Sequence, residues 1–473
     1  MNYYLLLAAA SAAVAWVTWR IWRKTREPSF VIGLLLIYYW TLYGGWSIIA
    51  DGLGGVTSGR YYYLYDKLFP IELDNYYFLT LLLYTIFVLG VALTVLRVAR
   101  GPGGAELPDV PLMISHPLVI SMCAVAAFLS YTIVREAIQS SAQLGQSAYT
   151  ATRNGDIGPL FTLHQVLNRI AVLPAALGLA VAASGKDPKW IAARRNYLHV
   201  AGYLMVLAGM YGFCAVLGNK QELFAGLLAG TLFYLANARR PRVWLVAGGG
   251  AVSFALIGTV DWLRGLPLVG AWEQLNWRDM ETALVDIGRS NEAFGAHFSL
   301  YGVLRFETPI TFGASVISLM ASVVPRVFWP DRPLDVYPYY AERVQAAGGQ
   351  GYSLHHAAGW YLNFGIAGVI LGAVVWGWLW ASLFNRFHRV RPNQVVMRFF
   401  TVLAPWMFVA GIPSLIRTGI EGYKGLTVDS LLVPTVSLAL SHTLVASLNR
   451  VARPARHPQR QPVQPASARP RLT

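Results

Sequence analysis

Long apolar runs constrain this chain more than any other feature of its sequence. Several of them approach the ~20 residues that a helix needs to cross a bilayer. Charged residues make up only 13% of the 473 residues, against roughly 25% in soluble domains. The sequence therefore predicts an all-α polytopic membrane protein. We expect eleven spans, at residues 3–21, 30–50, 74–96, 116–135, 160–184, 197–217, 222–238, 243–262, 357–384, 396–416 and 428–449.

Basic residues predict how these spans are oriented. Lys and Arg gather in the segments after spans 1, 3, 5, 7, 9 and 11, which all fall on one side of the membrane. Short loops rich in Lys and Arg mark the cytoplasmic side. We therefore expect the amino terminus outside and the carboxyl terminus in the cytoplasm. The same rule accounts for the net charge of +15, so we infer no nucleic-acid partner.

The spans divide the chain into four regions. Transmembrane helices 1–8 occupy residues 1–262, a large outer loop with short helices of its own occupies 263–356, and helices 9–11 occupy 357–450. Residues 451–473 are rich in Arg, Pro and Gln, which predicts a disordered basic tail in the cytoplasm. Within the loop, residues 309–324 are apolar but too few to span, so we expect a re-entrant or interfacial helix.

The outer loop contains a Pro-rich charged stretch, Val-Pro-Arg-Val-Phe-Trp-Pro-Asp-Arg-Pro, at residues 324–333. Proline restricts its own backbone and disfavours helix at the residue before it. Arg326, Asp331 and Arg332 are therefore expected on a stiff, non-helical backbone, as site residues often are. The alternative is a plain linker between two membrane helices.

Further basic residues lie on the outer side, against the charge bias. Arg169 falls inside the fifth span, where a cation normally faces a cavity or a partner; alternatively, it reaches the outer surface. Lys220 lies in an outer turn, residues 218–222, which could be a simple polar hairpin. Other outer cations that we consider for the site are Arg153, Arg289 and Arg305.

The chemistry that these residues favour is phosphate binding. The planar fork of Arg binds phosphate and diphosphate well, and fixed cations stabilise a departing diphosphate without a metal ion. The sequence has no nucleotide-binding glycine loop and no Asp-x-Asp pair, so we expect neither cofactor nor metal. His355 and His356 are adjacent, which suits a shared metal ion poorly.

Two motifs carry a resemblance to a known family. The stretch at 324–333 and Tyr-Leu-Asn-Phe-Gly-x-x-Gly at 361–368 resemble segments of O-antigen and exopolysaccharide repeat-unit polymerases. The turn at 218–222 is similar to one that these proteins carry before a central helix, where Arg is more usual than Lys220. Arg169 with Pro174 is similar to their fifth-span pattern.

The resemblance implies a glycosyltransferase C-like enzyme of the bacterial inner membrane. Such enzymes join undecaprenyl-diphosphate-linked repeat units at the periplasmic face, and a chain-length regulator and a flippase are implied as partners besides the lipid bilayer. A positioned His or carboxylate would activate the attacking hydroxyl, and aromatic rings would stack on sugars or form an interfacial belt. The candidate bases are His356, Glu307 and Asp331; the candidate binding residues are Arg326, Arg332, Arg169, Arg289, Lys220, Arg153, Arg305, Trp329 and Tyr352.

Other functions remain as alternatives. An O-antigen ligase has a related core but usually carries a His-Asn pair before the span that follows the loop, whereas His355 and His356 are followed here by two alanines. A lipid-linked oligosaccharide flippase or other transporter would carry ionisable residues through the midplane, and here they gather at one face. A non-catalytic assembly scaffold is the third alternative.

The predicted topology can be tested at position 343 in the outer loop. In a background in which Cys123 and Cys214 are replaced by Ala, an Arg343→Cys variant should react with a membrane-impermeant maleimide in intact cells. An Arg239→Cys variant should react only after permeabilisation, because Arg239 follows an odd-numbered span. Labelling of position 343 only in permeabilised cells would contradict an outer loop.

Overall fold

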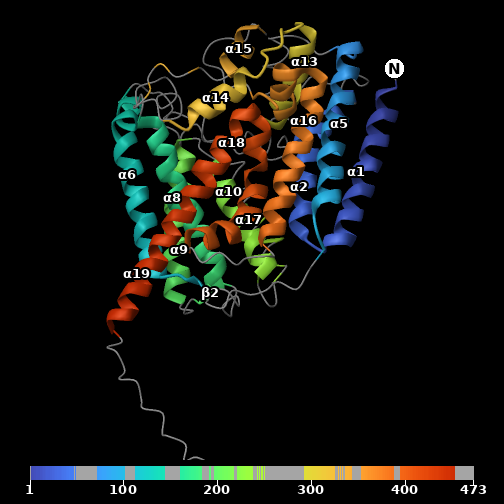
Figure 1. Cartoon of the computed structure of the whole chain (residues 1–473). Coiled ribbons are helices and arrows are strands. Elements are labelled where there is room, and N and C mark those ends of the chain that lie inside the picture. Colours follow the sequence, from blue (N-terminus) through green and yellow to red (C-terminus); the bar gives the residue numbers. More distant parts are fainter. Residues whose placement is uncertain are drawn as a thin grey trace, which may run out of the picture.

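Hydrocarbon contains no water to satisfy a peptide group, so a chain that crosses it must bond its backbone internally. The computed structural model shows the outcome, a bundle of long helices (Figure 1). The structure describes residues 2–46, 48–49, 72–101, 112–143, 160–183, 191–192, 197–217, 221–237, 242, 244, 247–248, 250, 292–324, 329, 331, 333, 336–343, 353–387 and 395–452.

The amino-terminal half contributes seven of the described α-helices and two very short strands. These elements are α1 (Tyr3–Thr25), α2 (Pro28–Tyr38) continued by the π-helical turn η1 (Tyr39–Tyr43), α5 (Asn75–Val98), β1 (Leu112–Met113), α6 (His116–Gln143), α8 (Leu160–Ala183), β2 (Ile191–Ala192), α9 (Tyr197–Val216) and α10 (Gln221–Asn237).

The carboxyl-terminal half contains three short helices before its long ones. These elements are α13 (Glu292–Arg305), α14 (Ala314–Ser322), α15 (Val336–Arg343), α16 (His356–Phe387), α17 (Val395–Arg417), η3 (Gly419–Glu421), α18 (Gly422–Lys424), η4 (Gly425–Leu432) and α19 (Val433–Ala452).

Figure 1 shows α13, α14 and α15 gathered at the end of the bundle where α1 begins. We call this the cap end. The opposite end, where α19 finishes, is the tail end. Strand β2 lies at the tail end, where it pairs in parallel with β1. Because these strands lead into α6 and α9, both helices start at the tail end and run toward the cap.

Within the described residues, seven helices are long and apolar enough to cross a membrane. They coincide with predicted spans 1–6 and 9, which confirms a multi-pass helical membrane protein. An eighth candidate, at predicted span 10, is a pair of helices, Val395–Thr401 and Leu403–Arg417, bent by 49°. Helix α17 contains Pro405 and Pro413, and proline removes a helix hydrogen bond.

The predicted total of eleven spans is not reached by the described residues. Span 222–238 is present as α10, whose apolar part, Glu222–Leu235, is shorter than a usual span. Span 428–449 falls on η4 and α19, which are not among the candidate spans. Most of span 243–262 lies outside the described residues. Eleven spans therefore stay a prediction.

Aromatic side chains hold the first helices to α16. The ring of Phe30 from α2 lies 5.1 Å from that of Trp380 and 4.6 Å from that of Phe384, measured between centroids. Trp376 and Trp380 are completely buried. Helix α5 packs between α1 and α16, while α8 packs against α6, α9 and α10. The two groups meet along α17, which contacts α2, α10 and α16.

Helix α16 is broken near its start. Phe364 (φ −142°, ψ 17°) and Gly365 (φ 62°, ψ −146°) leave the helical conformation, and the second pair of angles is accessible essentially to glycine alone. The break exposes backbone and side-chain groups of the preceding turn. Leu362 accepts a hydrogen bond at its carbonyl from Thr311 N (2.7 Å), and Asn363 accepts one at Oδ1 from Ser315 N (3.1 Å).

These bonds dock α14, the short helix predicted within residues 309–324. Its small side chains, such as Ser315 and Ser318, face the protein, whereas Ile317 and Met320 are 64% and 71% exposed. A nine-residue helix is about 13 Å long at 1.5 Å per residue, which is too short to cross a ~30 Å core. The segment is thus a short amphipathic helix at the cap end.

Gly365→Ala should destabilise the protein. A side chain in that backbone conformation costs on the order of 1–3 kcal/mol, and the strain lies where α14 attaches. We expect a lower thermal midpoint for the detergent-solubilised variant. Gly209→Ala in α9 is the matched control, because a methyl group there meets no atom within 4 Å. Equal midpoints for the two variants would contradict the role assigned to the break.

Candidate functional site

A buried ion pair joins α8 to α10. Arg169 Nε lies 3.8 Å from Glu222 Oε1, and the two residues are only 8% and 5% exposed. Arg169 therefore does not reach the outer surface, which was the alternative to a buried role. Glu222 lies in the first turn of α10, where a carboxylate also interacts favourably with the helix dipole. Because α9 runs toward the cap, the start of α10 and the pair lie on the cap side of the bundle.

Next to Arg169 is a closed ring of hydrogen bonds among Ser130, His164 and Asn168, all fully buried. Ser130 donates to Asn168 Oδ1 (2.7 Å), so its oxygen accepts from His164 Nδ1 (2.7 Å). His164 Nε2 then accepts from Asn168 Nδ2 (3.2 Å). The ring ties α6 to α8 and holds the turn that presents Arg169.

Two histidines beneath the cap have structural hydrogen bonds at both ring nitrogens. His297 donates from Nδ1 to the Thr41 carbonyl (2.7 Å), and its Nε2 lies 3.0 Å from the Tyr77 hydroxyl. Burial lowers the pKa of His297 to about 4, so its ring is neutral at pH 7. His355 accepts at Nδ1 from Ala357 N (3.0 Å) and therefore donates from Nε2 to Thr41 Oγ1 (3.1 Å). The two rings link α13 and the start of α16 to η1.

His356, a predicted catalytic base, is also fully buried. Its Nδ1 donates to the Gly419 carbonyl (2.7 Å). Its Nε2 accepts from Trp360 Nε1 (3.0 Å) and lies 3.2 Å from the Tyr423 hydroxyl. A proton acceptor at Nε2 would have to give up these contacts, so the geometry favours a positioning role between α16 and the η3–α18 segment. Its catalytic role stays a prediction.

Arg305 and Glu307 lie together at the surface of the cap. Arg305 pairs with Asp74 (3.0 Å) and Glu72 (3.6 Å), just before α5. Glu307, at a positive φ of 47°, accepts a hydrogen bond from the Tyr76 hydroxyl (3.3 Å). Arg305 is thus already balanced by two carboxylates, which favours a role in attaching α13 to α5 over phosphate binding.

The remaining predicted site residues fall into two groups. Trp329 and Asp331 are exposed at the surface. Arg326, Arg332, Arg289, Lys220, Arg153 and Tyr352 lie outside the described residues. In the part of the chain that the structure describes, no group of three His, Cys, Asp or Glu side chains could hold a metal ion.

Sequence analysis missed several residues that organise these groups. Glu222 was noted only as part of a polar turn, although a cation inside a span calls for a carboxylate partner. Asp74 and Glu72 are the partners of Arg305, and no sequence pattern pointed to them. Asn363 lies in the motif at 361–368, and that motif was the sequence feature from which its importance could have been predicted.

The fold and composition define the class, a multi-pass helical membrane protein with short helices at one end of its bundle. Comparison with protein-family models, curated proteins and solved structures finds no match for the chain. The particular activity is therefore a matter for proposal from the residues themselves.

Replacing one residue of the Arg169–Glu222 pair should destabilise the protein more than replacing both. Removal of one partner of a buried pair typically costs about 3–5 kcal/mol, whereas apolar replacement of both is often close to neutral. Glu222→Leu should therefore lower the thermal midpoint strongly, and adding Arg169→Leu should restore much of it. A double-mutant cycle in detergent measures this coupling. Additive losses would show that the two side chains do not depend on each other.

Proposed function

We propose that the protein joins lipid-diphosphate-linked oligosaccharide repeat units into a polysaccharide, at the outer face of the bacterial inner membrane. The observation that carries the proposal is the buried Arg169–Glu222 pair. A pair within a membrane bundle is expensive to desolvate and marks a functional site by default. The pair lies on the cap side of the bundle. The predicted topology assigns the segment with Arg326 and Arg332 to the same side.

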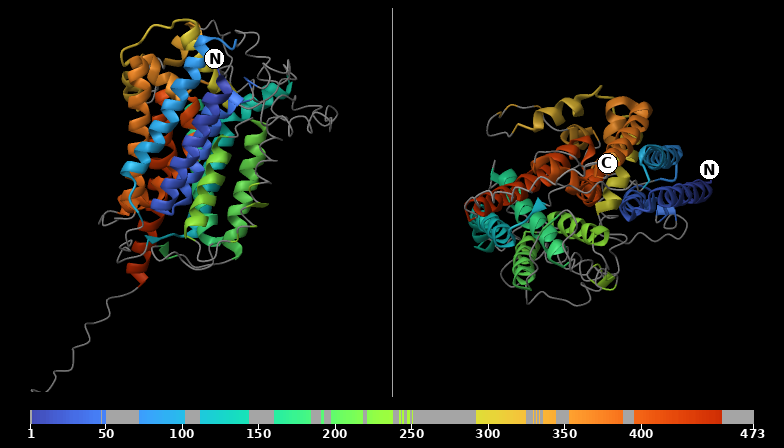
Figure 2. Two further views of the ribbon diagram at one scale, coloured as in Figure 1. Left: turned by 90° about the vertical axis from the view of Figure 1, so that its right-hand side faces the viewer. Right: turned by 60° about the horizontal axis from the view of Figure 1, so that its bottom comes forward.

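The distribution of basic residues supports this orientation. Arg23 and Lys24 finish α1, Arg97 finishes α5 and Arg386 lies in the last turn of α16. These helices end at the tail end (Figure 2, left). The positive-inside rule assigns such an end to the cytoplasm. The cap then faces the periplasm, where a lipid-linked repeat unit would meet the growing chain.

The proposed reaction is glycosyl transfer without a metal ion. A hydroxyl oxygen of the incoming repeat unit attacks the anomeric carbon of the growing chain, the bond from that carbon to the diphosphate breaks, and lipid diphosphate leaves. Arg326 and Arg332, assisted by Arg169, neutralise the charge that gathers on the diphosphate. The attacking hydroxyl loses its proton to a base.

The described contacts favour a carboxylate as that base. Glu307 and Asp331 are exposed at the cap surface, whereas both ring nitrogens of His356 are engaged inside the bundle. Trp329, 43% exposed, is free to stack on a sugar ring or to lie at the membrane interface. The donor lipid tail would lie against the apolar face of α14, next to Ile317 and Met320.

Gene deletion separates the proposed activity from its alternatives. Loss of a polymerase should abolish long polysaccharide while single repeat units still reach the surface. Loss of a ligase should leave finished polymer on its lipid carrier, and loss of a flippase should trap repeat units in the cytoplasmic leaflet. Either of the last two patterns would contradict the proposal.

Charge-retaining substitutions test the diphosphate clamp. Arg326→Lys keeps the charge but loses the bidentate fork, so polymerisation should slow by about 10²–10³, the range found when one oriented donor is removed. Because the proposed transfer needs no metal ion, polymerisation by the wild type should also continue in the presence of EDTA. Arg343→Lys is the matched control, because Arg343 is an exposed cation of the same cap that stacks on Tyr339. Normal polymer from an Arg326→Ala/Arg332→Ala protein at normal abundance would rule the clamp out.

A further inference from the structure

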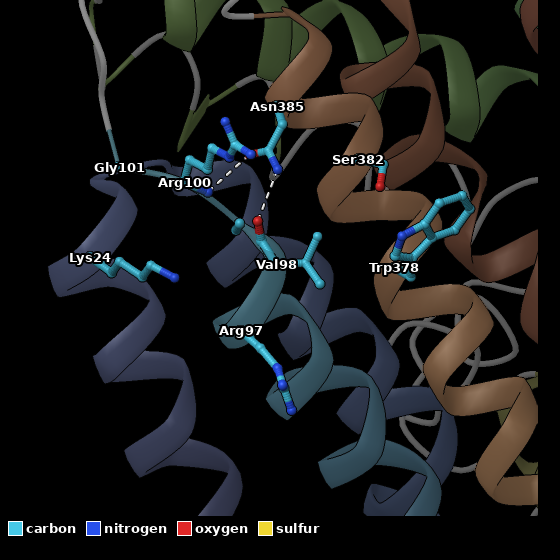
Figure 3. A pocket seen from close by; sticks show the side chains of 9 residues that line it. Lys24, Arg97, Val98, Arg100, Gly101, Trp378, Ser382 and Asn385 are labelled. Carbon is cyan, nitrogen blue, oxygen red and sulfur yellow. Dashed lines mark hydrogen bonds between the residues drawn. The ribbon is translucent and has the colours of Figure 1, made fainter.

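A second charged feature lies at the opposite end of the molecule and plays no part in the proposed reaction. A cavity of about 730 Å³ opens where α1, α5 and α16 end (Figure 3). We call it the basic pocket. Its walls are formed by Lys24 from α1, by residues 97–101 at and just after the end of α5, and by Trp378, Ser382 and Asn385 from α16.

The basic pocket carries an excess of positive charge. Lys24, Arg97 and Arg100 line it, and none of the lining residues that the structure describes is acidic. Three helix carboxyl ends converge there, and each contributes about half a negative charge. Together they supply roughly −1.5, which balances only part of three full positive charges. A bound anion would offset the remainder.

The contacts in the basic pocket leave two of its cations available. Asn385 accepts from Arg100 N (2.9 Å) and donates to the Val98 carbonyl (2.9 Å), which fastens the end of α5 to α16. Lys24 donates to the Leu96 carbonyl (2.6 Å). Among the described residues, the guanidinium groups of Arg97 and Arg100 have no hydrogen-bond or ion-pair partner. Arg97, Arg100 and Ser382 therefore line one cavity from the end of α5 and from α16 (Figure 3), and the two guanidinium groups are available to a ligand.

Neighbouring aromatic residues place the basic pocket at the level of a membrane interface. Arg20 and Arg23 stack over the rings of Trp16 and Trp19 on α1, at 5.4 Å and 5.1 Å. Trp378, in the wall of the cavity, is 55% exposed. Tryptophan and arginine together are typical of the headgroup region, which is where the phosphates of a bilayer lie.

We propose that the basic pocket is a binding site for a phosphate-bearing anion at the tail end of the bundle. Arg97 and Arg100 hold the phosphate, Lys24 and the Ser382 hydroxyl assist, and Trp378 packs beside the group that carries it. Basic pockets between membrane helices recognise anionic headgroups in this way, and a soluble phosphate compound offers the same chemistry. The site is independent of the function proposed for the cap.

The experiment uses the full-length protein in nanodiscs of phosphatidylcholine with increasing phosphatidylglycerol. Thermal midpoints and native mass spectrometry report protection and retained lipid, and inorganic phosphate and pyrophosphate are added in parallel. Arg97→Gln/Arg100→Gln should weaken phosphatidylglycerol binding about 25-fold, since each cation near the surface contributes about 1 kcal/mol, or roughly fivefold. Arg20→Gln/Arg23→Gln is the matched control, with the same charge change near the membrane surface but outside the pocket, and should lose clearly less binding.

Each outcome either tests the site itself or identifies whether the bound phosphate comes from a lipid or from a soluble compound. Selective loss of phosphatidylglycerol in Arg97→Gln/Arg100→Gln identifies a lipid headgroup. Protection by phosphate or pyrophosphate alone, lost in the same variant, supports the site with a soluble source. Equal loss in the control, or no binding of any probe by wild type, overturns the site. Ser382→Phe, which removes the hydroxyl, narrows the cavity and keeps every charge, should also weaken anion binding. Normal binding by this variant would overturn the proposal even if the Gln variant fails to fold.

Discussion

The break in α16 is the constraint on which the cap depends. A helix that stayed regular through Phe364 and Gly365 would keep the Leu362 carbonyl inside its own ladder. Because the ladder stops there, Leu362 and Asn363 are free to bond the backbone that precedes and begins α14. Asn363 also donates to the Gly359 carbonyl (2.6 Å), so its side chain is held at both ends. Irregular backbone at membrane depth is tolerated only where such partners exist.

The two ends of the bundle handle charge differently. At the cap side, Arg169 and Glu222 neutralise each other in a buried contact, and Arg305 is balanced by Asp74 and Glu72. At the tail end, Lys24, Arg97 and Arg100 face a cavity whose described lining contains no acidic side chain. The net charge of each cap-side group is thus close to zero or negative, whereas the excess of positive charge at the tail end attracts an anion.

Sequence predicted the elements that depend on composition and missed those that depend on partners. Apolar length predicted the seven spans that the described helices confirm. Pro405, which opposes the carbonyl of Thr401, explains the bend that the sequence analysis did not predict in α17. The motif at 361–368 was described only as a resemblance, and the structure shows what two of its residues do. Asn363 binds the start of α14, and Gly365 adopts a backbone conformation that essentially only glycine can adopt. The partners of Arg169 and His356 could not be predicted, because Glu222 and Gly419 lie 53 and 63 residues away in the chain and are brought near only by packing.

The pair between α8 and α10 also has a consequence for biogenesis. The ribosome makes Arg169 before Glu222, so α8 enters the membrane while its counter-charge is still unsynthesised. Until α10 arrives, the guanidinium must remain at the translocon or the headgroup region, since an isolated charge in hydrocarbon is costly. The buried pair can therefore form only after α9 has crossed and returned the chain to the cap end. The ion pair that joins α8 to α10 in the finished bundle thus also sets the order in which these helices can pack.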